Sequence, residues 1–414
     1  MGSAGLAQFE SVSGPRPRRD RVALNDERIL DAAVVVLDRF GIDGLSARRV
    51  AEQAGLSTGA IYGRFENTDE LLVEVWNRRL RSVVLAGLER SIRMSDPAVG
   101  DPDPVVPESF DPVAERIGAF VIALAPRSDV LSEVVVPDVD AWLRAMGVGP
   151  GNPATSRARR AIAIAAYFGA MLNGSVSEAL HPDWVLCLRW WEEARARETL
   201  PLSGPVAWLP PARIAVESGN PELDVLLLAT GEVMARAGVA GTTVTRIARR
   251  AGVPRSAVYA HFDSKDDLVQ ACIFQATANA SASARRLKSL TAPHGVASVA
   301  HRVTDPAGRQ WRRRRIEGLL AAIYSPALAS AFLLAEVETE NELIMRIGLI
   351  DAGEEYALRQ LLRFFDVLAT GLAVVPELST VFEGIDWRIV LTPITEQASA
   401  EIFGGMRPSL ITTG

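Results

Sequence analysis

The sequence contains one eighteen-residue phrase in two versions. Residues 54–71 read AGLSTGAIYGRFENTDEL, and residues 251–268 read AGVPRSAVYAHFDSKDDL. With a shift of 197 positions, residues 28–71 and 225–268 share 15 identities in 44 positions without a gap. Most of the remaining positions keep their apolar character. The repeat predicts two segments with the same local fold, and a chain built from two similar halves.

Each copy has the pattern of a helix-turn-helix. In the first, apolar residues recur at three- and four-residue spacing over 27–40, which predicts an amphipathic helix. Two shorter helices are predicted over 46–54 and 57–65, and Gly55 ends the first of them. Two short helices joined by a turn that contains glycine are typical of a helix-turn-helix. The NTDELL segment that follows starts with the pattern of a capped helix.

The composition is that of a helical globular protein. The chain has 414 residues, of which 48% are hydrophobic and 23% are charged, and this length predicts about two to four domains. No strand alternation is recognisable, so the fold class is predicted as all-α. The sequence has no apolar run as long as a membrane span and no signal-peptide core at the N-terminus, which predicts a cytoplasmic, nucleoid-associated protein.

The sequence offers no pattern of a catalytic or metal site. Its two cysteines and four histidines have none of the spacings of metal ligands. No activated nucleophile and no glycine-rich phosphate loop is recognisable. We therefore expect a protein that is not an enzyme and that needs no cofactor and no metal. Cys187 and Cys272 are predicted as small buried apolar residues.

Charge is distributed unevenly along the chain. The net charge is −6, yet residues 241–265 carry four arginines and Lys265 against one acid, Asp263, for a local charge of +4. Basic residues concentrated in one small element are the electrostatic footprint of nucleic-acid contact. A second basic run, RQWRRRRIEG at 309–318, is interpreted as a solvated helix face, with a second nucleic-acid patch as the alternative.

The repeated segment resembles the DNA-binding domain of the TetR family of bacterial transcriptional regulators. The resemblance runs from the first apolar helix through a Gly-x-x-Gly pair to TTVTRIARRAGVPRSAVYAHFDSKDDL at 242–268, and it is specific over roughly 45 residues in each half. It implies that each unit has a helix-turn-helix domain followed by a helical ligand-binding and dimerisation domain. Two units in one chain then imply an intramolecular pseudo-dimer, and a further homodimer stays open.

The predicted domain order follows from the two copies and from the proline- and glycine-rich stretch between them. It comprises a flexible basic N-terminal arm, the first helix-turn-helix domain, the first regulatory domain, a linker, the second helix-turn-helix domain and the second regulatory domain. These parts are predicted at residues 1–21, 22–82, 83–199, 200–222, 223–280 and 281–414, respectively.

The residues that would contact double-stranded DNA follow from the third helix of each copy. Its exposed stripe would enter a major groove, where base edges can be read. The stripes are Thr58, Gly59, Tyr62 and Gly63 in the first copy, and Arg255, Ser256, Tyr259 and Ala260 in the second. The resemblance implies phosphate contacts, which set register without reading sequence, for Ser46, Arg48, Tyr62, Arg64, Thr243, Thr245, Tyr259, His261 and Lys265.

Arg255 is the expected base reader, because a guanidinium can pair with guanine through two hydrogen bonds. Since the two stripes differ, the predicted operator has two unlike half-sites. The first copy also departs from the family pattern, with Arg64 where His is usual and Thr68 where Lys is usual. In the second copy, Pro254 replaces the usual capping Ser or Thr.

The expected function is that of a transcriptional repressor that a small apolar effector releases from DNA. The aromatic and apolar residues proposed for the effector pocket, most of which must also serve as core, are Phe120, Trp142, Phe168, Met171, Tyr324, Phe332 and Phe364. The alternative is an effector- or partner-binding protein whose degenerate helix-turn-helix units bind no specific DNA.

Overall fold

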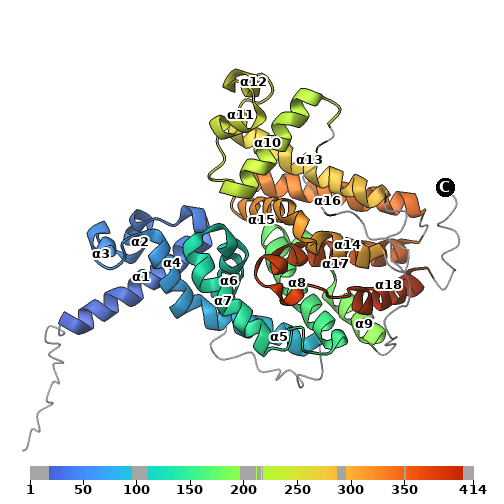
Figure 1. Cartoon of the computed structure of the whole chain (residues 1–414), viewed down its shortest axis with the longest axis horizontal. Coiled ribbons are helices and arrows are strands. Elements are labelled where there is room, and N and C mark those ends of the chain that lie inside the picture. Colours follow the sequence, from blue (N-terminus) through green and yellow to red (C-terminus); the bar gives the residue numbers. More distant parts are fainter. Residues whose placement is uncertain are drawn as a thin grey trace, which may run out of the picture. The chain divides into compact units, whose positions relative to one another are not determined.

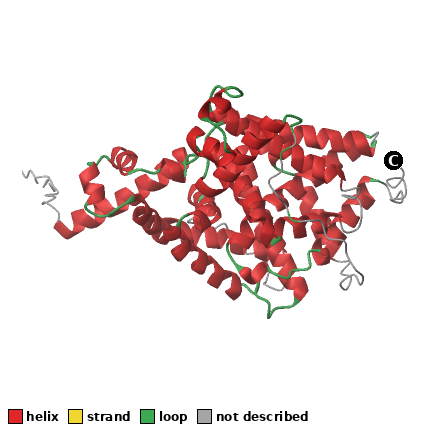
Figure 2. Ribbon diagram, turned by 45° about the horizontal axis from the view of Figure 1, so that its top comes forward, coloured by secondary structure: helices red, strands yellow, loops and turns green. Residues whose placement is uncertain are grey.

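The computed structural model describes residues 18–95, 111–195, 211, 216, 218–286, 295–348 and 351–403, with the backbone alone for 18–23, 276–286 and 346–347. Helices account for nearly all of this described part, and no strand occurs in it (Figure 2). The all-α prediction is confirmed. None of the described helices is both long and apolar enough to span a bilayer. The chain divides into two compact units, Met1–Arg79 and Leu80–Gly414.

The first unit is a helix-turn-helix domain. Its elements are α1 (Arg18–Phe40), η1 (Ile42–Gly44), α2 (Ala47–Ala54), α3 (Thr58–Tyr62) and α4 (Thr68–Val75). Helix α1 starts earlier than the predicted residue 27, and its first turn includes the last four residues of the predicted basic arm. The rest of that arm, residues 1–17, lies outside the described part of the chain.

Local chemistry fixes the ends of the short helices in the first unit. The Ser46 hydroxyl accepts a hydrogen bond from the Arg49 amide, and the Ser57 hydroxyl accepts one from the Ala60 amide, as N-cap residues do. Gly55 ends α2 at a φ of 64°, a left-handed conformation that favours glycine. Its counterpart Gly252 has a φ of 72°, so the repeated glycine is explained by backbone geometry.

The second unit begins in the π-helical turn η2 (Trp76–Leu80) and contains the second helix-turn-helix together with the other helices of both halves. The elements of its first half are α5 (Arg81–Ser95), α6 (Pro112–Leu124), η4 (Ala125–Arg127), α7 (Asp129–Ala145), α8 (Ala154–Val176), η5 (Glu178–Leu180) and α9 (Trp184–Arg195). The second half has α10 (Pro221–Ala237), α11 (Val244–Ala251), α12 (Arg255–Tyr259), α13 (Lys265–Arg286), α14 (Gly295–Thr304), η6 (Pro306–Gly308), α15 (Arg309–Ile323), α16 (Pro326–Ile347), α17 (Ala352–Val374), η7 (Val375–Glu377), η8 (Thr380–Phe382) and α18 (Arg388–Ile402).

The second helix-turn-helix shares its core with the helices behind it. Ile247 of α11 and Val258 of α12 belong to one apolar cluster with Leu319 of α15 and Phe332 of α16. Helix α13 lies beside α16 along this cluster (Figure 1). Because buried apolar surface is the main source of stability, this helix-turn-helix is fixed to the helices that follow it in its own half.

The two halves meet where α8 lies beside α17 (Figure 1). A Cβ atom on Gly169 would overlap the carbonyl oxygen of Val367, and one on Gly371 would overlap the carbonyl oxygen of Ala165. The contact is thus reciprocal, since 165 and 169 are related to 367 and 371 by one common shift of 202 positions (367 − 165 and 371 − 169). Glycines at both points allow the two backbones to approach closely.

Hydrogen bonds between the halves flank the α8–α17 contact. The Asn173 side-chain amide donates to Asp366 at 2.7 Å. The Asp183 backbone amide donates to the Gln360 side chain at 2.8 Å. At the other pair of helices, α9 and α18, the Trp190 indole donates to Glu401 at 2.8 Å. Polar pairing around a close-packed centre fixes the register of the two halves.

The arginine run on α15 is mostly buried, so the prediction of a solvated helix face is wrong. Arg312 has an exposed fraction of 2% and Arg314 one of 8%. Arg312 pairs with Glu377 at 2.7 Å, and Arg315 pairs with Asp366 at 2.5 Å. Sequence reasoning failed here because the carboxylates that pair with these arginines lie 51 to 65 positions away.

Helix α15 also contacts the first half. Arg127 of η4 pairs with Glu317 at 3.0 Å, and Arg313 donates to the Pro126 carbonyl at 2.8 Å. The Arg127 and Glu317 side chains are 20% and 8% exposed. A charge pair that is largely withdrawn from water is strongly destabilising to break, so this contact adds to the attachment between the halves.

We predict that Gly371→Ala destabilises the second unit, although alanine is the better helix former by about 1 kcal/mol. Overlap with the Ala165 carbonyl should outweigh that gain and lower the free energy of unfolding by roughly 1–3 kcal/mol. Chemical denaturation measures the change. Gly353→Ala is the matched control on the same helix, because its neighbour is the tip of the exposed Asp351 side chain. Equal stability of both variants would contradict the close approach.

Candidate nucleic-acid interface and effector cavity

The predicted reading stripe of the first copy is exposed on α3. Thr58, Gly59, Tyr62 and Gly63 all face solvent, and Tyr62 is 63% exposed. Ile61 lies in the core at 2%, and the Phe65 amide donates back to the Ile61 carbonyl at 3.0 Å. The helix therefore buries one side and leaves the polar and small residues free on the other.

The stripe of the second copy is exposed in the same way on α12. Arg255, Ser256, Tyr259 and Ala260 face solvent, while Val258 is buried at 1%. Among the residues whose side chains are described, no acid pairs with Arg255, so its guanidinium is available to a ligand. Pro254 precedes the helix without a side-chain cap, as expected for proline at a first turn.

Three of the four predicted phosphate contacts of the first copy, Ser46, Arg48 and Arg64, already have partners within the domain. Arg64 donates to both carboxylate oxygens of Asp26, at 2.5 and 2.6 Å. Arg48 donates to Glu52 at 2.8 Å, one helical turn away. The Ser46 hydroxyl is occupied as the α2 cap. The sequence could not predict the Arg64–Asp26 pair, because the residues are 38 positions apart.

The corresponding groups of the second copy are freer. Thr243 caps α11 by accepting from the Arg246 amide at 3.2 Å, and Thr245 is exposed. His261 lies 3.6 Å from Glu222, and Lys265 lies 3.4 Å from Asp266. These acids are 84% and 78% exposed, so water screens both pairs.

The two interfaces therefore differ in charge as well as in reading residues. Residues 46–71 carry three arginines against four acids, for a net charge of −1, whereas 243–268 carry five basic residues against three acids, for +2. Phosphate neutralisation supplies most of the non-specific affinity for DNA. The geometry of both domains is that of a helix-turn-helix, while the basic surface is concentrated on the second.

Comparison with known proteins tests the origin of the repeat. A family model described as bacterial regulatory proteins, tetR family, matches residues 29–75 and again residues 226–272. The chain is a TetR family protein with two tandem units. No curated protein matches the chain. The two matched segments are DNA-binding helix-turn-helix domains of a transcriptional regulator, and the exposed stripes of α3 and α12 both lie inside them.

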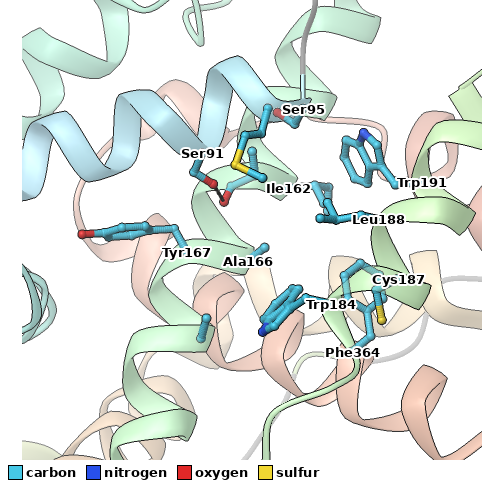
Figure 3. A pocket seen from close by; sticks show the side chains of 13 residues that line it. Ser91, Ser95, Ile162, Ala166, Tyr167, Trp184, Cys187, Leu188, Trp191 and Phe364 are labelled. Atoms are coloured by element: carbon cyan, nitrogen blue, oxygen red, sulfur yellow. Dashed lines mark hydrogen bonds between the residues drawn. The ribbon is translucent and has the colours of Figure 1, made fainter. Parts of the chain in front are cut away.

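The second unit of this TetR protein contains an apolar cavity of about 240 Å³. Helices α5, α8 and α9 of the first half form most of its wall, and Phe364 of α17 adds a ring from the second half (Figure 3). The Phe364 ring meets Trp184 edge-on, with centroids 6.4 Å apart. The cavity thus lies where the two halves meet. Its remaining lining residues are Ser91, Met94, Ser95, Ile162, Ala163, Ala166, Tyr167, Ala170, Cys187, Leu188 and Trp191.

Three hydroxyl groups of the cavity wall already have hydrogen-bond partners, whereas the buried Trp191 Nε1 has none among the described residues. The Ser91 hydroxyl donates to the Ala163 carbonyl, the Ser95 hydroxyl to the Ile92 carbonyl, and the Tyr167 hydroxyl to Glu115. Burial raises the pKa of the Cys187 thiol to about 12, so it stays neutral. Burial also raises the pKa of Tyr167 well above its usual range. The cavity therefore presents carbon surface and neutral groups.

Of the residues predicted for the effector pocket, Phe364 lines this cavity and the other six do not. Phe120, Phe168 and Phe332 are core residues, at 5% exposure or less. The half-buried ones are Trp142, Met171 and Tyr324. Helix α8 turns Ala166, Tyr167 and Ala170 to the cavity, so Phe168 and Met171 face elsewhere.

A signal for the cavity was present in the sequence. Trp184, Cys187, Leu188 and Trp191 recur at i, i+3, i+4 and i+7, the spacing of one helix face, and all four line the cavity. Periodicity predicts such a face but does not distinguish a cavity wall from a filled core, because that depends on which helices pack against it.

We predict that Asp26→Asn strengthens DNA binding. The substitution releases Arg64 for a phosphate, so affinity should rise roughly two- to fivefold and the salt dependence should steepen by about one counter-ion. Mobility shifts at several salt concentrations measure both. Asp31→Asn is the matched control, because it removes the same charge from α1 while Arg79 keeps its pair with Glu27. An identical gain from both variants would mean that Arg64 is not the cause.

Proposed function

We propose that this TetR protein is a repressor that reads an operator with two unlike half-sites and leaves DNA when a neutral apolar effector binds. The observation that carries the proposal is the pair of exposed, unequal stripes on equivalent helices of the two DNA-binding domains. Tyr62 and Tyr259 are kept in both, whereas Thr58 and Arg255 differ. Residues kept on both stripes favour a shared mode of binding, and residues that differ favour different base sequences.

The proposed functional form is an intramolecular pseudo-dimer. The reciprocal approach of α8 and α17, with Gly169 and Gly371 in equivalent places, supports it, because a two-fold interface brings the same patch of both partners together. One chain then provides two DNA-binding domains, as a pair of chains would. Two half-sites about one helical turn, ~34–36 Å, apart would suit such a pair.

Substitution of the exposed stripe of the first DNA-binding domain tests whether the two half-sites are unlike. The triple variant Thr58→Arg/Gly59→Ser/Gly63→Ala gives the first domain the stripe of the second. It should bind a symmetric operator built from two copies of the Arg255 half-site about tenfold more tightly than the native chain does, since a two-pronged arginine–base pair contributes about 1–3 kcal/mol. Footprinting on the DNA upstream of the gene defines the half-sites, and mobility shifts compare the operators.

The double variant Gly59→Ser/Gly63→Ala is the control, because it lacks the new guanidinium and should show little of the gain. A native footprint that is an accurate palindrome would count against unlike half-sites. Shifts that competitor DNA abolishes would instead favour the alternative, a partner-binding protein with degenerate helix-turn-helix units.

The effector is proposed to act through the cavity between α5, α8, α9 and α17. Elements α4, η2 and α5 follow one another in the chain over 68–95, so the cavity wall of α5 continues from the first DNA-binding domain. A ligand that separates Phe364 from α9 would change how the halves pack. It would thereby change the distance between the reading helices α3 and α12. Effector and DNA must then weaken each other by the same factor.

We predict that Ala166→Trp fills the cavity and abolishes the effector response. The neutral dye N-phenyl-1-naphthylamine serves as the probe, because its fluorescence increases in apolar surroundings. The native chain should bind it and release operator DNA, whereas Ala166→Trp should do neither and still bind DNA. Val185→Trp, at an 81% exposed site of α9, is the control. Dye binding that is unchanged by Ala166→Trp would assign the dye to another site.

A further inference from the structure

The first half of the chain contacts the second DNA-binding domain at the end of α10. Gly238, which ends α10 at a φ of 68°, is buried and lies inside the matched segment 226–272. A Cβ atom there would lie 2.3 Å from Arg127 Nη1 and 2.9 Å from Glu317 Oε2. The Gly238 backbone therefore packs directly against the ion pair that joins η4 of the first half to α15 of the second.

Polar groups carry this contact between η4, α10 and α15, the η4 joint. Arg127 donates to the Glu317 carboxylate at 3.0 Å. In the opposite direction, Arg313 of α15 donates to the Pro126 carbonyl at 2.8 Å. A void of about 20 Å³ remains beside them, lined in part by Ala235 of α10. A void leaves its lining without partner atoms on one side, so apolar packing contributes less here than in the apolar cluster behind α11 and α12.

The charges of the η4 joint have no equivalents at the other end of the pseudo-dimer. The serine N-caps of α7 and α16 are 197 positions apart (325 − 128). With the same shift, the equivalents of Arg127 and Glu317 are Tyr324 and Phe120. Two identical chains would repeat each contact of a two-fold interface. The residue types of this fused chain instead allow the ion pair at the second DNA-binding domain and not at the equivalent place of the first.

We propose that Arg127 is a positioning residue, through which the first half fixes the second DNA-binding domain and its reading helix α12. An ion pair that is largely withdrawn from water is costly to break, so η4 and the end of α10 should keep one arrangement. Helices α10, α11 and α12 share one apolar core, and the position of α12 therefore follows that of η4.

The consequence for DNA rests on the proposed function, whereas the attachment itself does not. Two reading helices must lie at a defined distance to occupy two half-sites together. Arg127 contacts no DNA in this proposal and acts on operator binding through that distance.

Hydrogen–deuterium exchange of the full chain, without DNA, tests the attachment. The main variant is Arg127→Ala/Glu317→Gln, because Arg127→Ala by itself would leave a buried carboxylate unpaired. Protection from exchange over residues 230–243 should fall at least about tenfold, since local opening there becomes easier. Residues 361–374 of α17 should keep their protection.

Arg157→Ala is the matched control. Arg157 also joins the two halves, by donating to the Val381 carbonyl of η8 at 2.8 Å, so its loss should leave residues 230–243 protected. Unchanged protection of 230–243 in the main variant overturns the proposal. An equal fall over 361–374 would mean general destabilisation and overturns it as well.

Mobility shifts test the effect on the position of α12. Two base pairs inserted between the half-sites add about 7 Å and should weaken binding by the native chain at least about tenfold, but binding by the main variant at most about threefold. Both proteins should bind a single Arg255 half-site equally. Equal losses from the insertion overturn the proposal. A native chain that binds neither operator contradicts the proposed function instead, and the exchange measurement then decides the role of Arg127.

Discussion

The close approach of α8 and α17 is the contact on which the organisation of the second unit depends. A backbone can come this near to its neighbour only where the residue that faces it has no side chain, and Gly169 and Gly371 provide that space from opposite partners. The hydrogen bonds from Asn173 and Asp183 then fix the register. The apolar cavity lies at the edge of this same contact, with Phe364 of α17 in its wall. A ligand there would bear on how the two halves are held together.

The two DNA-binding domains share a fold and differ in electrostatics. In each domain the helix before the reading helix, α2 or α11, has a side-chain N-cap and ends at a glycine with left-handed backbone. Each reading helix also has a buried apolar residue. In the first domain Arg64 pairs with Asp26, while in the second none of the acids that the structure describes pairs with Arg255. This TetR protein thus combines one weakly charged and one basic reading surface in a single chain. A fused pair can keep such a difference, because each half varies separately, whereas identical chains cannot.

Helix α15 shows how a buried charge network can replace an apolar contact. Glu377 receives several arginines, and Glu317 reaches back to Arg127 in the first half. These pairs make the arginine run part of the interior. Arg314 is the exception in this network, since none of the described acids pairs with it.

The sequence by itself determined the helical class, the two tandem helix-turn-helix domains and the family, because these follow from short-range spacing, caps and turns. It also determined which residues stand on the exposed stripes, since helical periodicity separates Tyr62 from Ile61. Only the tertiary structure decided that the arginine run is buried, that Arg64 pairs with Asp26 and that α9 lines a cavity. Each of these depends on contacts between residues far apart in the chain, and periodicity carries no information on which faces meet.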